Sequence, residues 1–143
     1  MKKKLGVILS LVLLLPTLLL SGCSKAVPLP DSMDQEAVSQ AAQQIVAELI
    51  AGEYQIVADR FRADTKEKYS ITAETVKAMM DTVAEAGAYV STERILVLGG
   101  ESKSMDEDYA SVGVSCKHEK KTVYYELSLD VNLELIGLAA KQK

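Results

Sequence analysis

The hydrophobic pattern of this chain changes its period at Ala88, and this change constrains the fold more than any other feature. Before Ala88, apolar residues recur about every 3.6 residues, which is typical of helices packed on one side. After Ala88, apolar and polar residues alternate, which is typical of strands with one buried face. Helices followed by strands, with no alternation between the two, predict an α+β domain in which N-terminal helices pack on a curved four-stranded antiparallel sheet.

Three helices are expected before Ala88. Ser32 is predicted to cap the first one, with Gln35 completing a capping box, and a continuous apolar stripe then runs to Gly52. A second, shorter helix is expected over residues 53–62, with Ile56, Val57 and Phe61 facing the core. Residues 63–70 are expected to form a loop or a frayed helix.

Thr72 is the expected N-cap of the third helix, and Gly87 its stop. Its apolar positions have the spacing of one helix face: Val76, Met79, Met80 and Val83. The two Met side chains could form an adaptable binding surface, but this spacing favours core packing.

The four expected strands cover residues 88–98, the region around 110–116, residues 123–130 and residues 133–140. In the second strand, Cys116 shares the apolar face and should therefore be buried and unreactive. In the third, Tyr125 is on the apolar face, whereas Glu126 and Asp130 are predicted to lie on the solvated face. Gly137 is expected at a bend or bulge of the fourth strand.

Two polar segments between these strands have an alternative interpretation. His118 is expected in the connection 117–121, where a catalytic role would require the turn to fold over a pocket. The run Asp106-Glu107-Asp108 could bind calcium weakly, but it lacks the ligand spacing of a dedicated loop and is more typical of a solvated connection.

The N-terminus has the form of an export signal. Three Lys residues precede an apolar run of 16 residues, Leu5–Leu20, which is shorter than the roughly 20 residues that a membrane span needs. Leu20-Ser21-Gly22-Cys23 follows and resembles the lipobox of bacterial lipoproteins. An uncleaved anchor and an ordinary secretory signal are the alternatives.

The resemblance implies that Leu20, Ser21 and Gly22 are recognised by the signal peptidase and that Cys23 is lipidated as the first mature residue. It predicts a signal peptide over residues 1–22, a lipidated tether over 23–32 and a single α+β domain over 33–143. The protein would then be anchored in the cell envelope, on the outer surface of the cytoplasmic membrane. Because no Asp follows Cys23, the outer membrane stays open as a location in a Gram-negative cell.

Composition narrows the range of partners and cofactors. The expected signal peptide carries three of the 16 basic residues and none of the 20 acidic ones, so the mature chain would have a net charge of about −7. Such a surface would repel nucleic acid and anionic lipid, so membrane attachment is expected only through the lipid on Cys23. With one His and two Cys, the chain has almost no ligands for zinc, and no metal or other cofactor is expected.

The order of elements, the turn Ala51-Gly52-Glu53-Tyr54, Phe61 at the end of the second helix and Gly137 late in the last strand resemble the nuclear transport factor 2-like, or cystatin-like cone, domains. Within them, residues 34–140 resemble the bacterial envelope family known as domain of unknown function 3887. The resemblance implies a sheet that wraps against the helices and often encloses a conical pocket, which binds a small apolar ligand in some members. Tyr125, Phe61 and Met80 are then the expected lining residues.

Two functions follow from this resemblance. The first is a non-catalytic domain that binds a small apolar ligand or an envelope protein, with a homodimer through the sheet as a variant. The second is an isomerase- or dehydratase-like enzyme that acts in the cone pocket. A general acid or base must be held in an enclosed pocket, and the inward-facing positions supply only Tyr125, so the sequence favours the binding domain.

Overall fold

The computed structural model of the chain describes residues 26–100 and 106–143. The predicted signal peptide and the lipobox Leu20–Cys23 lie outside the described residues. Four α-helices come first: α2 (Gln35–Ile50), α3 (Tyr54–Asp59), α4 (Ala63–Lys68) and α5 (Ala73–Asp81), followed by a 3-10 turn, η1 (Ala84–Ala86). Four strands complete the domain: β1 (Tyr89–Gly99), β2 (Tyr109–His118), β3 (Thr122–Asp130) and β4 (Leu135–Gln142). The predicted α+β class is confirmed.

The long helix α2 begins two residues later than expected. Asp34, not Ser32, is its N-cap, and the Asp34 carboxylate accepts a hydrogen bond of 2.8 Å from the backbone N–H of Ala37. The cap moves because Met33 is buried and its N–H bonds the carbonyl of Pro30, which holds the preceding turn outside the helix. At the other end, Gly52 has a φ of +77°. The backbone N–H groups of Gly52 and of the next residue donate to the carbonyls of Leu49 and Glu48 and so end the helix.

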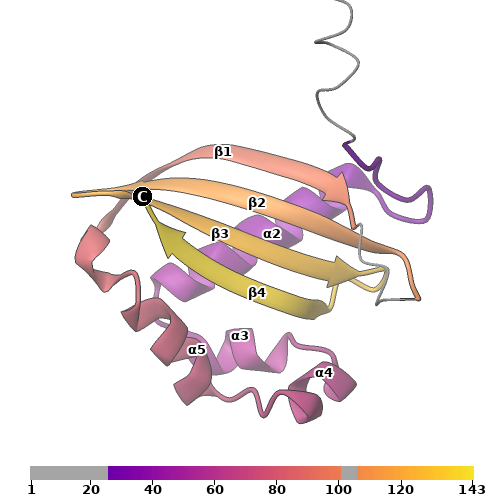
Figure 1. Cartoon of the computed structure of the whole chain (residues 1–143), viewed down its shortest axis with the longest axis horizontal. Helices are drawn as coiled ribbons and strands as arrows, with labels where there is room; N and C mark the ends of the chain where they lie inside the picture. The colour runs from indigo at the N-terminus through magenta and orange to yellow at the C-terminus, as the bar shows by residue number, and fades with distance from the viewer. Residues whose placement is uncertain (1–25, 101–105) are drawn as a thin grey trace, which may run out of the picture.

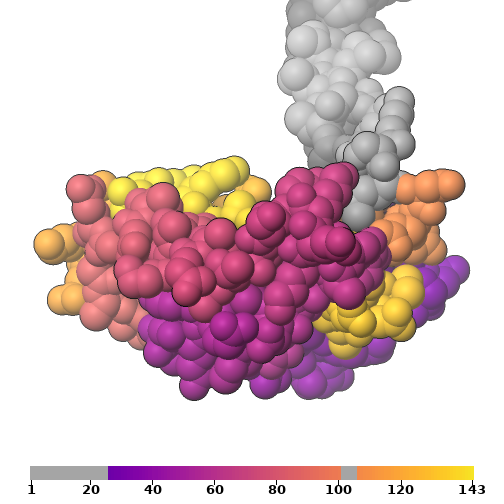
Figure 2. Space-filling model, turned by 90° about the horizontal axis from the view of Figure 1, so that it is seen from below, coloured from indigo at the N-terminus to yellow at the C-terminus, as the bar shows by residue number. Residues whose placement is uncertain are grey.

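The shorter helices form a second group beside α2. Thr72 caps α5 as predicted, in a capping box with Thr75. Val57 and Phe61 are buried as expected, but Ile56 is 47% exposed, because the buried face of α3 carries Val57 and Ala58. Residues 63–68 form the helix α4. Figure 2 shows α3 to α5 lying as one layer with α2 next to them.

The strands form one antiparallel sheet in the order β1-β2-β3-β4, and the sheet does not close into a barrel. Figure 1 views it from the face that α2 to α5 leave uncovered: α2 crosses behind the strands, and α3 to α5 lie along the side of β4. The covered face carries the predicted alternate residues, all at most 1% exposed. They are Ala110, Val112, Val114 and Cys116 in β2 and Val123, Tyr125, Leu127 and Leu129 in β3.

Two expectations about β3 and β4 have opposite outcomes. The predicted irregularity at Gly137 is confirmed, because the register shifts between Ser128, which pairs with Gly137, and Leu129, which pairs with Leu135. The predicted solvation of Asp130 is wrong: this residue is 2% exposed. It ends β3, and its carboxylate turns back to bond the backbone N–H groups of Asn132 and Glu134, each at 2.9 Å.

The predicted tether lies partly against the domain. The Val27 carbonyl accepts a bond of 2.9 Å from Gly99 N–H at the end of β1, and Leu29 packs on the core. A side chain at position 99 would meet the Pro28 carbonyl, because a Cβ there would lie 2.1 Å from its oxygen. Gly99 therefore permits this contact. Within residues 26–100 and 106–143, no helix is long and apolar enough to cross a membrane.

Candidate functional site

An apolar groove of about 480 Å³ lies between the C-terminal half of α2 and the edge strand β1. Two bulges in β1, between Tyr89 and Ser91 and between Thr92 and Arg94, take the first half of this strand out of regular register. The first six residues of β1 are exposed. The groove is lined by Gln43, Gln44, Val46, Ala47, Ile50, Ala51, Tyr89, Thr92 and Val114, none of which is charged.

A second hollow of about 200 Å³ shares Ile50 and Tyr89 with the groove, so the two lie side by side. Its walls come from α2, α3, the end of α5 and the start of β1, and its polar lining includes Tyr54, Asp81 and His118. The apolar groove therefore lies next to a hollow that has a partly polar lining.

His118 is not in a solvated connection, which corrects the expectation for this residue. It is the last residue of β2 and is 8% exposed. The turn after it folds against the start of β1: Glu119 N–H bonds the Ala88 carbonyl at 2.9 Å, and the Glu119 carboxylate accepts from Ala88 N–H at 2.7 Å. His118 itself lines the hollow, whereas the turn that follows it bonds Ala88 and contributes no lining residue.

The hydrogen bond of His118 assigns its neutral tautomer. Nδ1 lies 2.9 Å from the carbonyl oxygen of Gly87, which can only accept, so Nδ1 carries the proton. In the neutral ring Nε2 is then an acceptor, and it is buried without a hydrogen-bond partner among the described residues. The Tyr89 ring packs against the imidazole edge to face, with centroids 6.0 Å apart.

The three predicted lining residues lie in different places. Tyr125 is 0% exposed in the core; burial raises the pKa of its hydroxyl, which has no hydrogen-bond partner among the described residues. Phe61 lines a hollow between α5 and β4, together with Met79 and Leu138. Met80 lines the His118 hollow. The structure therefore brings Met80, but not Tyr125 or Phe61, to the site next to the groove.

Cys116 is buried as predicted. Its sulfur lies 3.7 Å from the hydroxyl of Thr92, which in turn is 2.9 Å from the Tyr89 hydroxyl. Burial raises the pKa of the Cys116 thiol, which disfavours the reactive thiolate.

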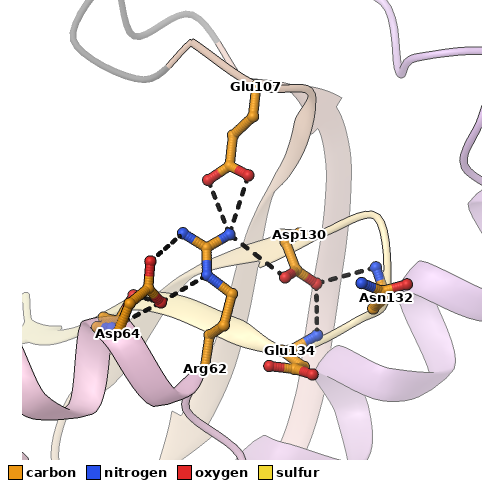
Figure 3. A network of polar contacts seen from close by, with 7 residues as sticks. Arg62, Asp64, Glu107, Asp130, Asn132 and Glu134 are labelled. Carbon is orange, nitrogen blue, oxygen red and sulfur yellow. Dashed lines mark hydrogen bonds and ion pairs between the residues drawn. The ribbon is translucent and has the colours of Figure 1, made fainter.

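A second polar cluster surrounds Arg62, shown in Figure 3. Its guanidinium pairs with both oxygens of Asp64, at 2.7 and 3.0 Å, with Glu107 at 2.8 Å and with the buried Asp130 at 3.4 Å. These partners come from α4, from the segment before β2 and from the end of β3. Arg62 therefore holds three parts of the chain together.

The Arg62 cluster is better explained as a structural clamp than as a reactive site. The carboxylates that would do chemistry are occupied by the guanidinium and by backbone N–H groups. Within the described part of the chain, no three His, Cys, Asp or Glu side chains come together in a way that could hold a metal ion. The groove and the His118 hollow are therefore the candidate site.

Sequence reasoning did not find the groove, because it is formed by the bulges of β1 and by α2, which are distant in sequence. The one available signal for the hollow was the solitary His followed by Glu119. The contact between His118 and Gly87 joins residues 31 positions apart, so no local sequence pattern predicts it.

Comparison with known proteins supports the fold. A family model described as "Protein of unknown function (DUF3887)" matches residues 42–138, which is 97 of the 143 residues. A protein from Ruminococcus gnavus, solved by NMR, has a similar structure with a TM-score of 0.66 and 22% sequence identity. The match covers 80% of this chain and 96% of the Ruminococcus chain. A search of curated protein sequences finds no match.

Proposed function

This chain belongs to the DUF3887 family of proteins of unknown function, and from that premise we propose that it is a lipid-anchored domain of the cell envelope. Its role is to bind a small apolar molecule in the groove between α2 and β1 without catalysing a reaction.

The groove itself carries this proposal. Its volume of about 480 Å³ is in the range of sites for small organic molecules, roughly 300–1,000 Å³. Its walls are aliphatic and aromatic, with two Gln side chains at the rim of α2. Burial of an apolar ligand there would be driven by the removal of its surface from water.

The same lining favours binding over the isomerase- or dehydratase-like alternative. An acid–base enzyme needs a titratable group within hydrogen-bond reach of the reacting atom. The described residues that line the groove include no acid, Lys or His. Asp81 and His118 line only the neighbouring hollow, so neither reaches a reacting atom within the groove itself, and Asp81 is paired with Lys77 at 2.9 Å.

The anchor is supported by the sequence Leu20-Ser21-Gly22-Cys23 after a short apolar run. Attachment through Cys23 would place the domain on the outer surface of the cytoplasmic membrane, or on the outer membrane of a Gram-negative cell. The fold supports a close attachment, because Val27, four residues after Cys23, is bonded to Gly99.

A protein partner or a second copy on the uncovered face of the sheet is the variant of this proposal. Leu96 is on that face and is 39% exposed. Sedimentation of the domain at several concentrations would distinguish a homodimer from a monomer.

The groove can be tested with the neutral fluorophore N-phenyl-1-naphthylamine and the domain of residues 26–143. We expect saturable fluorescence enhancement that is lost in Ala47→Trp, because Ala47 is exposed on the groove wall and the indole would fill it. Gln40→Trp is the matched control, since Gln40 is exposed on α2 outside the groove. Equal binding by the two variants would contradict the proposal.

A further inference from the structure

The unpaired nitrogen of His118 indicates what chemistry the ligand has. We propose that the apolar molecule bound in the groove carries a neutral hydroxyl group, and that this hydroxyl donates a hydrogen bond to Nε2 of His118. This inference rests on the proposed function, because it specifies the ligand class of the same site.

The first step is the state of the imidazole. The Gly87 carbonyl holds a proton on Nδ1, so in the neutral imidazole Nε2 presents a lone pair. Buried acceptors are nearly always paired, because an acceptor removed from water without a partner costs free energy. Nε2 is buried without a partner among the described residues, in a side chain that lines the hollow. Because Nε2 itself has almost no accessible surface, a neighbouring side chain must move aside, and a donor brought by a ligand would then satisfy it.

The second step is the position of this nitrogen relative to the groove. The groove and the hollow share Ile50 and Tyr89, so they adjoin, and the proposed ligand extends past these two side chains. Its apolar body would contact Val46 and Ala47 of α2, and its polar end would enter the hollow of about 200 Å³. The hollow is large enough for a terminal group and small for the whole ligand.

The third step is the charge of the ligand. A carboxylate or a fully ionised phosphate would present only acceptors to the Nε2 lone pair, so it could not supply the missing donor. A neutral alcohol or phenol supplies the missing donor without bringing a charge into a partly apolar site.

A matched pair of probes tests this inference: 2-naphthol, which has a hydroxyl donor, and 2-methoxynaphthalene, which has the same ring system without the donor. The protein used is the domain of residues 26–143. We expect it to bind 2-naphthol about tenfold more tightly than the ether, because one buried hydrogen bond has an effect of about this size.

The chain contains one His, so ¹⁵N-histidine labelling reports His118 alone. We expect the Nε2 resonance to shift on addition of 2-naphthol and to stay in place with the ether. This measurement requires no mutation, so it stands even if substitution of His118 prevents folding.

Two substitutions of His118 then test the roles of its two ring nitrogens separately. In His118→Asn, the amide can still donate to the Gly87 carbonyl but has no acceptor at the Nε2 position, so the preference for 2-naphthol should disappear. In His118→Gln, the longer side chain can place an acceptor near that position, and much of the preference should return.

The outcomes separate the two proposals. If both probes bind the wild-type domain equally and Nε2 does not respond, the hydroxyl inference is wrong while the groove remains a binding site. If neither probe binds, and N-phenyl-1-naphthylamine does not bind either, the proposed function is wrong and the inference is wrong with it.

Discussion

The Arg62 guanidinium pairs with carboxylates from three parts of the chain, and its charge should be visible in the titration of Asp64. The hydrogen bonds from its guanidinium lower the pKa of Asp64 to about 2. Because this folded-state pKa lies below the ordinary Asp value of about 3.9, the pair stabilises the fold above about pH 4. That contribution is lost as the pH falls through about 2.

We therefore expect Arg62→Met to raise the Asp64 midpoint toward about 3.9, measured by NMR titration of the side-chain carboxyl carbon. Arg60→Met is the control, because Arg60 pairs with Glu48 and not with Asp64. If Asp64 titrates alike in the wild type and in Arg62→Met, the ion pair in Figure 3 does not form in solution.

Cys116 provides a second test at the level of one residue. Its side chain is 0% exposed and burial raises the pKa of its thiol, so a polar disulfide reagent should react slowly with the native domain and rapidly in denaturant. The number of thiols that react with time is measured by absorbance. Fast reaction under native conditions would indicate that the register of β2 is shifted by one residue, since such a shift exchanges the two faces.

At the scale of elements, one ion pair joins α2 to the segment between α3 and α4. The Arg60 guanidinium donates two hydrogen bonds of 2.6 Å to Glu48, whose side chain is 10% exposed within the buried face of α2. The backbone of Arg60 also accepts a bond of 2.9 Å from Leu135 N–H at the start of β4. Arg60 therefore connects α2, through its side chain, to the edge strand β4, through its backbone.

We expect Arg60→Met to lower the free energy of unfolding by about 1–2 kcal/mol, because a buried carboxylate loses its partner while Arg60 itself is partly solvated. Urea denaturation measures this change. Lys66→Met removes a pair with Asp59, whose side chain is 58% exposed, and should cost less than about 1 kcal/mol. If the two variants lost equal amounts of unfolding free energy, the burial of the Glu48 carboxylate would not account for the effect of Arg60.

At the scale of the whole molecule, the described N-terminal segment limits how far the domain can stand from a membrane. If the lipid is on Cys23, the four residues to Val27 can span no more than about 14 Å. The end of the domain at Gly99, where Val27 is bonded, would then face the bilayer.

The anchor is tested by Cys23→Ala in a bacterial host that is fed labelled palmitate. We expect the label to be lost and the protein to move from the membrane fraction to the soluble one, because Cys23 is the predicted lipid acceptor. Cys116→Ala should keep both the label and the membrane location. Labelling that persists in Cys23→Ala would refute the lipobox hypothesis.

Local pattern was sufficient for the elements and for most of their buried faces. The stripe of α2, the Thr72 cap and the alternation of β2 and β3 depend on neighbours within a few residues, so periodicity and capping chemistry predict them. It failed at Ser32, where the burial of Met33 decided the outcome, and at Ile56, because α3 packs on the core through Val57 and Ala58 instead.

The sequence by itself therefore determined the α+β class, the order of the elements and the burial of Cys116, all of which follow from short-range regularities. Only the tertiary structure decided the groove, the burial of Asp130 and the environment of His118. Arg62 meets Asp130 across 68 residues, and His118 meets Gly87 across 31. Such pairs are selected by how the layers pack and where β1 bulges, and a packing contact between distant segments has no period that a sequence can display.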